Sequence, residues 1–429
     1  MPFSVTDHPS FATGLRWLYV DFNSYFASVE QQLNPDLRGL PVMVVPVESD
    51  ATCAIAASYE AKAFGIKTGT PVYEAKRLCP EVVCVLARHE HYVDFHARIC
   101  DEVDKHIPIT QVCSIDEVAC RLMDNETSIE RVSAIAAAIK AGLRAHIGEA
   151  VRCSIGVAAN KYLAKVATDL HKPDGFTILH PAEVEARLRP LPLRDLPGIG
   201  RNMELRLQAA GIDTMAQLWA LDAKQMRKVW GGVWGERMWY YLRGAELPEM
   251  ETTRASVGHS HVMAPALRDP AQAKFVARRL AIKAASRLRR MGYYARAMQL
   301  SARTEQGGRV RAECHFERMQ DTAGLLAQLE LLWREAMAQG RGARLKKVSV
   351  TLSGLVAADA LQPELFDRLP DSHAQRRERA ERASRAMDAI NHRFGRDSVL
   401  QGMLPSQGKS FSGTKVAFTR IPDVEEFLE

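Results

Sequence analysis

Two short apolar runs that favour β-strands each carry acidic side chains, and these acids restrict how the chain can fold. The run "RWLYVDF" holds Asp21 just before a helix-like segment, and "CSIDEVAC" holds Asp116 and Glu117 side by side. Charged groups among apolar residues are costly to bury unless something binds them. Taken singly, Asp21 has a simple alternative role as a helix cap, and Asp116 and Glu117 as guards of a strand end or edge.

Taken together, the three acids predict a shared metal site. If the two strands are neighbours, Asp21 and Asp116 lie opposite each other on one face, and Glu117 reaches the site from the strand edge. Crowded carboxylates need a counter-charge, and a site made only of oxygen ligands suits Mg²⁺. Two such ions are the usual arrangement for in-line phosphoryl or nucleotidyl transfer.

The order of expected elements indicates an α+β protein of several domains, because 429 residues exceed what one core holds. Strand-like and helix-like stretches alternate first, and the region 180–245 is helical. Residues 254–357 then read as strand, helix (271–290), two strands, helix (322–338) and strand, which resembles a split β-α-β unit. From residue 358 the chain is polar and rich in arginine, with little promise of a core of its own.

Two local signals predict helices. Thr70 and Pro71 suit the N-cap and the first helical position of one helix. Apolar residues at i, i+3, i+4 and i+7 predict another helix after Asn160. These residues are Leu163, Val166, Ala167 and Leu170.

The composition is that of an ordinary soluble protein with a mildly basic charge. The net charge of +6 permits a polyanionic partner without requiring one. No uncharged apolar run approaches membrane-spanning length, and the N-terminus lacks the plan of a signal peptide, so no membrane association is expected. The eight cysteines show no CxxC spacing, which fits a reducing cytoplasm better than a zinc or disulfide framework.

Several basic or glycine-rich stretches suggest phosphate contacts. "LPGIG", with Gly198 and Gly200, suits either a helix-hairpin-helix on DNA phosphates or a tight turn alone. The helix 271–290 carries seven cations and no acid, so it lacks the i,i+4 pairs of a merely solvated helix, and DNA contact is the favoured interpretation. These cations are Lys274, Arg278, Arg279, Lys283, Arg287, Arg289 and Arg290.

Three further residues gain functional meaning only if a triphosphate lies between them. Tyr59 and Lys62 stand three apart and so share a helix face, and Lys172 follows another helix in the loop "HKPDG". The alternatives are a core tyrosine with a lysine packed beside it, and a solvated lysine at a helix C-terminus.

As an ordered set, these motifs resemble those of the Y-family translesion DNA polymerases over residues 15–357. The matching stretches are "YVDFNSYFASVE", "SYEAKAFGIKTGTP", "CSIDEVA", "SIGVAANKYLAKVATDLHKPDG", "LPGIG" and "SVGHS". The resemblance implies a right-hand fold with a palm, small fingers, a thumb and a little finger. The expected boundaries are 1–24 and 89–179 (palm), 25–88 (fingers), 180–245 (thumb), 246–253 (linker), 254–357 (little finger) and 358–429 (tail).

The resemblance also assigns roles to residues. Asp21, Asp116 and Glu117 would ligate two Mg²⁺ ions, which Mn²⁺ can replace, together with the backbone carbonyl of Phe22. Phe26 would be the steric gate that excludes ribonucleotides. The incoming triphosphate would be bound by Tyr59, Lys62, Lys172 and backbone groups near Ser24 and Tyr25.

Three positions depart from the family pattern. Lys62 stands where arginine is usual, which replaces a planar fork by a point charge. Asn23 occupies a position that is often acidic, and Ala56 one that often carries a hydroxyl. None of these changes affects the expected metal ligands.

The tail is similar to that of the UmuC branch of the family. "AMDAINHRFGRDSV" carries this likeness, and "QPELF" resembles a sliding-clamp-binding peptide anchored by Gln362, Leu365 and Phe366. A chance match in a polar tail is the alternative for the clamp peptide.

The resemblance implies a monomeric, error-prone, template-directed DNA polymerase for lesion bypass. Its partners would be primer-template DNA, a deoxynucleoside triphosphate and a sliding clamp. Two alternatives stay open at this point: a non-catalytic relative that serves as an adaptor to the clamp and DNA, and another two-metal palm enzyme such as a nucleotide cyclase. The three acids argue against the first, and the expected thumb and basic helix argue against the second.

Overall fold

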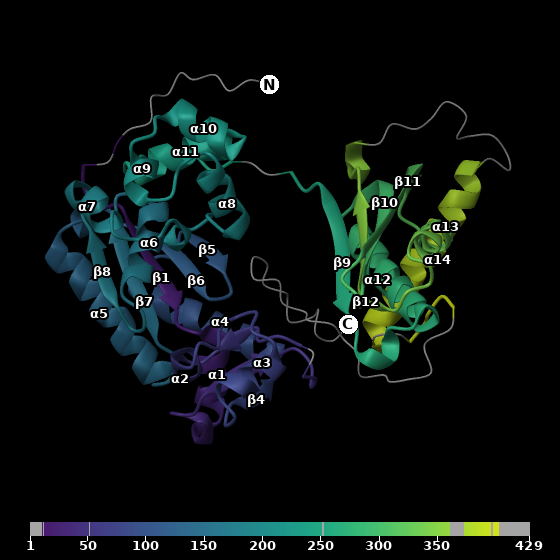
Figure 1. Cartoon of the computed structure of the whole chain (residues 1–429), viewed down its shortest axis with the longest axis horizontal. Coiled ribbons are helices and arrows are strands. Elements are labelled where there is room, and N and C mark those ends of the chain that lie inside the picture. Colours follow the sequence, from purple (N-terminus) through teal and green to yellow (C-terminus); the bar gives the residue numbers. More distant parts are fainter. Residues whose placement is uncertain are drawn as a thin grey trace. The chain divides into compact units, whose positions relative to one another are not determined.

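The computed structural model describes residues 11, 13–50, 52–250, 253–360, 373–395 and 398–402. The chain forms two compact units, whose boundary in sequence falls between Met250 and Glu251 (Figure 1). None of the helices in the described ranges is long and apolar enough to cross a lipid bilayer.

A five-stranded sheet in the order β5-β6-β1-β7-β8 forms the centre of the first unit. Its strands are β1 (Trp17–Phe22), β5 (Gln111–Ser114), β6 (Glu117–Arg121), β7 (Cys153–Ala158) and β8 (Phe176–Leu179). Every residue of β1 is buried, which explains its nearly continuous apolar sequence. Helix α6 (Lys161–Leu170) packs on β1, β7 and β8, while α4 (His89–Asp104) and α5 (Ile129–His146) pack against each other.

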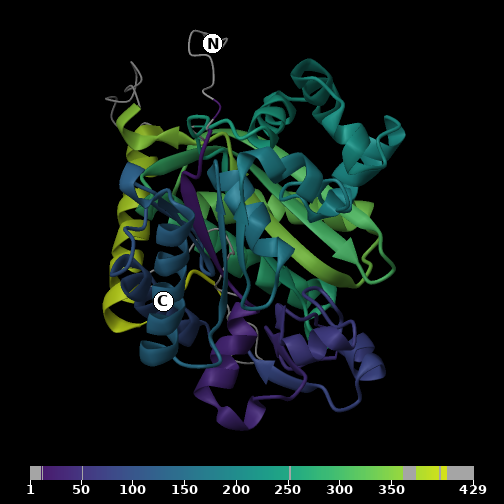
Figure 2. The same cartoon turned by 90° about the vertical axis from the view of Figure 1, so that its left-hand side faces the viewer.

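A smaller three-stranded sheet and three helices occupy the segment expected for the fingers (Figure 2, purple to blue). The elements are α1 (Tyr25–Leu33), β2 (Val42–Val45), β3 (Ala56–Ala57), α2 (Tyr59–Ala63), α3 (Val72–Leu78) and β4 (Val83–Leu86). The prediction for Thr70 and Pro71 was wrong, because Pro71 is the N-cap of α3 and not its first residue. The Thr70 hydroxyl instead accepts a hydrogen bond from the backbone N–H of Lys67 at 3.0 Å and closes the preceding turn.

The remainder of the first unit is helical, as the sequence predicts for 180–245. Its helices are α7 (Val184–Leu188), α8 (Arg201–Ala209), α9 (Met215–Trp219), α10 (Ala223–Trp230) and α11 (Val233–Leu242). Their apolar side chains share one cluster with Trp17 and Tyr19 of β1 and Leu163 of α6. The helical part therefore packs on the same face of the sheet that α6 covers.

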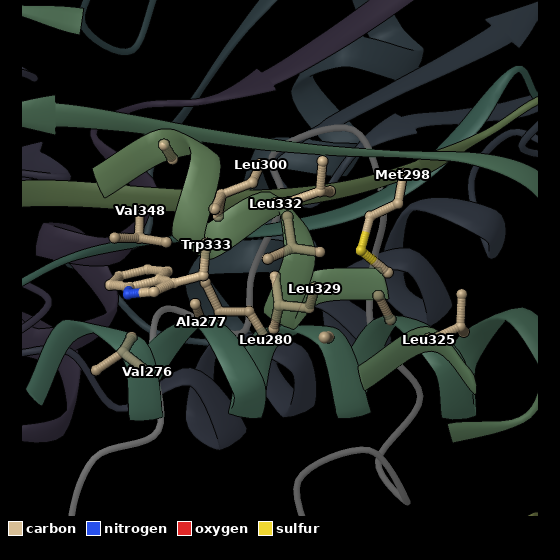
Figure 3. Close-up of a cluster of buried hydrophobic side chains, with 14 of the residues drawn as sticks. Val276, Ala277, Leu280, Met298, Leu300, Leu325, Leu329, Leu332, Trp333 and Val348 are labelled. Carbon is tan, nitrogen blue, oxygen red and sulfur yellow. The ribbon is translucent and has the colours of Figure 1, made fainter. Parts of the chain in front are cut away.

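The second unit has the predicted order of strand, helix, two strands, helix and strand. The elements are β9 (Ser256–Val262), α12 (Pro270–Arg290), β10 (Tyr293–Thr304), β11 (Arg309–Met319), α13 (Thr322–Gln339) and β12 (Leu345–Ser353), and a short strand β13 (Val356–Ala357) pairs with β10. The antiparallel sheet has the order β11-β10-β12-β9. Figure 3 shows its core, where Leu300 of β10 and Val348 of β12 meet Leu280 of α12 and Trp333 of α13.

The polar tail contains a helix that was not predicted from the sequence. Helix α14 (His373–Phe394) lies alongside α13, so this part of the chain packs on the core of the second unit without having a core of its own. The expected clamp peptide, with Gln362, Leu365 and Phe366, lies outside the described residues.

Two leucines of α13 provide a test of this packing. Leu329 is 1% exposed in the core, whereas Leu331 is 57% exposed. We expect Leu329→Ala to lower the free energy of unfolding of the second unit by about 3 kcal/mol, because it removes buried atoms and leaves a cavity. Leu331→Ala is the matched control and should change it by less than about 0.5 kcal/mol. Native-state hydrogen exchange of the β12 amides measures both values, and equal effects would contradict the packing.

Candidate active site

The three predicted acids meet at one end of the central sheet, but in a register that differs from the prediction. The cross-strand partner of Asp21 is Glu117, not Asp116. Asp116 lies in the tight turn between β5 and β6, where its carbonyl accepts a hydrogen bond from the backbone N–H of Phe22 at 2.9 Å. The prediction treated residues 113–120 as one strand, whereas they form a hairpin, so the two neighbouring acids are not on opposite faces of a strand.

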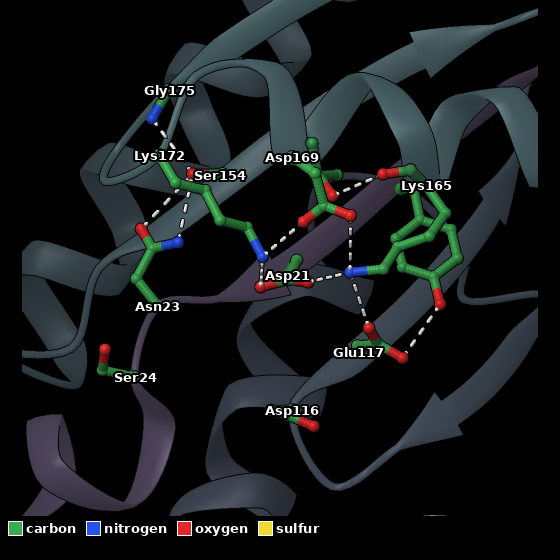
Figure 4. A network of polar contacts seen from close by, with 12 residues as sticks. Asp21, Asn23, Ser24, Asp116, Glu117, Ser154, Lys165, Asp169, Lys172 and Gly175 are labelled. Carbon is green, nitrogen blue, oxygen red and sulfur yellow. Dashed lines mark hydrogen bonds and ion pairs between the residues drawn. The ribbon is translucent and has the colours of Figure 1, made fainter. Parts of the chain in front are cut away.

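Asp21 is the buried centre of the site, with 8% of its side chain exposed. One carboxylate oxygen contacts the ammonium group of Lys165, and the other lies 2.7 Å from that of Lys172 (Figure 4). Burial alone would raise the pKa of the Asp21 carboxyl, but the two ammonium groups outweigh burial and lower it. Asp21 is therefore ionised at neutral pH.

Lys165 bridges the acids and was not among the site residues predicted from the sequence. Its ammonium group contacts Asp21, lies 2.8 Å from Glu117 and 3.5 Å from Asp169. Burial opposes this charge, but the surrounding carboxylates raise the pKa of Lys165 well above its ordinary value. Lys165, Asp169 and Lys172 stand at i, i+4 and i+7, opposite the apolar stripe of α6, and this polar stripe was the available signal.

Glu117 has a second partner on the same sheet face. The hydroxyl of Tyr19 donates a hydrogen bond to its carboxylate at 3.2 Å. Because side chains alternate along a strand, Tyr19 and Asp21 lie on the same face of the sheet, on which α6 packs. Lys165 of α6 therefore reaches both Asp21 and its cross-strand partner Glu117.

Asp116 differs from the other two acids because it forms no ion pair within the described parts of the chain. The hydroxyl of Ser114 donates a hydrogen bond to its carboxylate at 2.6 Å. Burial, and then the negative charges of Glu117 and Asp21, raise the pKa of Asp116 to about 6. A buried carboxylate in this electrostatic environment is stabilised by an added cation.

The residues expected to bind a triphosphate also come together. The ammonium group of Lys62 donates to the hydroxyl of Ser24 at 2.7 Å and lies 4.3 Å from the centre of the Tyr59 ring. Burial, and then repulsion from Lys172, lower the pKa of Lys62. The two ammonium groups are therefore close enough to repel each other. Ser24 has a left-handed backbone (φ 48°) at the N-cap of α1.

Tyr25 and Phe26 are buried at the start of α1. The Tyr25 hydroxyl donates to the carbonyl of Tyr92 at 2.6 Å, and the Phe26 ring stacks on the Tyr92 ring at a centroid distance of 4.5 Å. The first N–H groups of a helix have no acceptor within the helix, so the start of α1 is suited to bind an anion.

The acidic side chains are of the kind that bind a divalent cation, although in this structure lysines balance their negative charge. Within the described residues, no three acidic, histidine or cysteine side chains are grouped closely enough to hold a metal ion. The reason is visible in Figure 4, where the ammonium group of Lys165 lies between Asp21 and Glu117. The three carboxylates offer only oxygen atoms, the donor type that hard divalent cations prefer. Metal binding there would replace lysine contacts.

The predicted DNA contacts lie in two places. Gly198 has φ 93° in the loop before α8, and Gly200 is the N-cap of that helix. The α12 helix lacks balancing acids only within its own sequence, because Lys274 pairs with Glu330 of α13 at 2.6 Å. Arg289 likewise pairs with α14, so part of the positive charge on α12 is neutralised by neighbouring helices.

The other α12 cations expected to contact DNA differ in exposure: most are partly buried, and the one at the C-terminal end of α12 is exposed. Burial, and then the positive charges of Lys283 and Arg279, lower the pKa of His261 in β9 to about 4. These two cations therefore lie near the β9 side of the helix. Arg278 and Arg287 are half-buried, and Arg290 is exposed. DNA contact by these residues stays a prediction.

Comparison with known families gives three consistent matches along the chain. Residues 20–169 match the impB/mucB/samB family, and residues 254–365 match the C-terminal domain of that family. Residues 194–246 match the thumb domain described for DNA polymerase iota.

Curated relatives match over nearly the whole chain. A DNA polymerase IV of Moorella thermoacetica is 35% identical over 92% of this chain and 98% of the relative. A DNA polymerase IV of Pelotomaculum thermopropionicum is 33% identical over 90% of this chain and 94% of the relative.

The fold has a solved counterpart. A Y-family DNA polymerase chimera of Dbh and Dpo4 superposes with a TM-score of 0.66 at 25% identity, covering 80% of this chain and 99% of the chimera. This likeness and the thumb match confirm the predicted α+β right-hand fold class. The chain belongs to the Y-family of DNA polymerases.

Proposed function

We propose that this chain is a template-directed, error-prone DNA polymerase that extends a primer past damaged template bases. The observation that carries the proposal is the meeting of Asp21, Asp116 and Glu117 beside Lys165 and Lys172 at one end of the central sheet. The relatives that this chain matches over almost their whole length are named DNA polymerase IV, which supports the same activity. A non-catalytic adaptor would have no need of this acidic cluster.

The three acids would hold divalent metal, and we propose Mg²⁺. Asp21 and Asp116 would be ligands from β1 and the β5–β6 turn, with Glu117 and the Phe22 carbonyl beside them. When bound, the metal would supply positive charge that activates the primer 3′-hydroxyl and stabilises the leaving pyrophosphate. The protein's own contribution is a rigid sheet end that fixes the oxygen ligands before substrate arrives.

The incoming deoxynucleoside triphosphate would lie against the start of α1. Lys62 and Lys172 supply two positive charges, and their mutual repulsion would be relieved by a polyanion between them. Tyr59 would hold Lys62 in place through their ring contact. Phe26, fixed by its stack on Tyr92, would limit space at the sugar and exclude a 2′-hydroxyl.

DNA would be held by the regions that family likeness assigns to it. We propose that the Gly198–Gly200 turn binds the phosphate backbone through its N–H groups. We also propose that the palm, fingers, thumb, linker and little finger have the boundaries expected from the sequence. A sliding clamp bound through Gln362, Leu365 and Phe366 is also part of it.

Removing one carboxylate tests the catalytic role. We expect Asp116→Asn to slow Mg²⁺-dependent primer extension by about 100- to 1,000-fold or more, because a preorganised charge at the reacting centre is lost. The control is Asp124→Asn, since the Asp124 side chain is 94% exposed. Single-turnover extension measures the rate, and DNA binding by fluorescence anisotropy confirms that substrate still binds. Extension by Asp116→Asn at the wild-type rate would contradict the proposal.

Removing the bridging lysine tests the charge balance of the site. Without Lys165, Asp21 and Glu117 lose their shared cation, so the melting temperature of metal-free protein should fall by about 5–10 °C. Added Mg²⁺ should raise the melting temperature of Lys165→Met more than that of wild type, because metal then fills the vacant charge. Lys161→Met serves as the control, since its ion pair is with Glu249 outside the cluster. An equal Mg²⁺ response in all three proteins would refute this account.

A further inference from the structure

Helix α14 carries most of its arginines on its exposed side; the exception is Arg377, whose side chain is 19% exposed and lies 3.8 Å from Glu317 of β11. The helix begins beyond residue 365, where the family match ends. Two of its three acids point into the second unit. Glu381 accepts hydrogen bonds from the Tyr294 hydroxyl and the Gln320 amide, both at 2.9 Å. Asp388 accepts two from the Arg289 guanidinium, at 2.7 and 2.9 Å.

A polar seam fixes how α14 is rotated about its axis. The hydroxyl of Ser384 accepts a hydrogen bond from the backbone N–H of Thr322 at 3.0 Å. Glu381, Ser384 and Asp388 follow one another at intervals of three and four residues, so they share one helix face. Glu381 and Ser384 are buried, and buried polar contacts of this kind allow few alternative rotations. Figures 1 and 2 show the helix (yellow) as a straight rod.

The outward face is consequently basic. Its exposed arginines are Arg376, Arg379, Arg382, Arg385 and Arg393. The side chains of Arg382 and Arg385 are 65% and 56% exposed. Each forms only a long ion pair within the helix, Arg382 with Glu378 at 4.0 Å and Arg385 with Glu381 at 3.8 Å. Glu378 is the single acid of the helix on this side. An ordinary solvated helix places acids among its cations, whereas α14 has turned two of three acids inward.

We propose that the outward face of α14 is an accessory nucleic-acid-binding site that contacts the phosphate backbone of DNA without reading its base sequence. The site rests on the proposed function only in that a polymerase brings DNA to this chain. From Arg376 to Arg393 the helix rises about 25 Å at 1.5 Å per residue. This length matches about seven base pairs of duplex. A guanidinium group can donate two parallel hydrogen bonds to the oxygens of one phosphate, which makes DNA a fitting partner for five arginines.

The test uses the full chain with R376Q/R379Q/R382Q, and R376K/R379K/R382K as the charge-retaining control. Fluorescence anisotropy measures affinity for primer-template DNA between about 50 and 200 mM salt. Each phosphate contact contributes about 0.9 to the slope of log K against log salt, so the glutamine variant should lose about 2–3 from that slope and bind at least about tenfold more weakly. The lysine variant should keep most of both.

Two outcomes overturn the site: the glutamine variant binds DNA with the wild-type affinity and slope, or the lysine variant loses as much as the glutamine variant. If the first outcome is found and the wild-type chain binds polyglutamate, the partner of this face is an acidic protein. Equal melting temperatures of the three proteins show that the changes leave the fold intact. Repeating the series on Asp116→Asn, in which we expect slowed extension and an unchanged α14, separates failure of this site from failure of the proposed polymerase.

Discussion

The buried carboxylate of Asp21, shared by the ammonium groups of Lys165 and Lys172, determines how the rest of the site is arranged. A carboxylate on a fully buried strand is unstable without cations. Lys165 lies within α6, and Lys172 lies in the loop just beyond the end of that helix. The same contacts hold Glu117 beside Asp21 and bring Lys172 toward Lys62. The carboxylates of Asp21 and Glu117 are thus held in fixed positions at the end of the sheet. The ammonium groups of Lys62 and Lys172 are held close to each other nearby.

Much of the fold could be predicted because the responsible signals are local. The strand-helix order of the second unit was predicted correctly from the sequence, and α12 and α13 form within one residue of the expected limits. The register of the acids could not be predicted in this way. A two-residue turn at Ile115 and Asp116 changes which acid faces Asp21, and a run of β-forming residues does not reveal such a turn.

Lys165 and α14 were missed for a related reason. Lys165 acquires its role only when α6 packs over β1, a long-range contact that helix periodicity alone does not specify. Helix α14 docks through Glu381, Ser384 and Asp388 and not through leucines, so an apolar stripe does not mark its buried face. Polar seams of this kind depend on partners far away in sequence, here Tyr294, Thr322 and Arg289.

The central claim is that the three carboxylates form a site for two divalent ions when DNA and nucleotide are bound. Electron paramagnetic resonance of Mn²⁺ titrated into a complex with a chain-terminated primer, template and deoxynucleoside triphosphate tests it most directly. The account predicts two tightly bound Mn²⁺ ions per chain that are lost or weakened in Asp21→Asn. No tightly bound Mn²⁺ in the wild-type complex, or binding that is unchanged by Asp21→Asn, would contradict it.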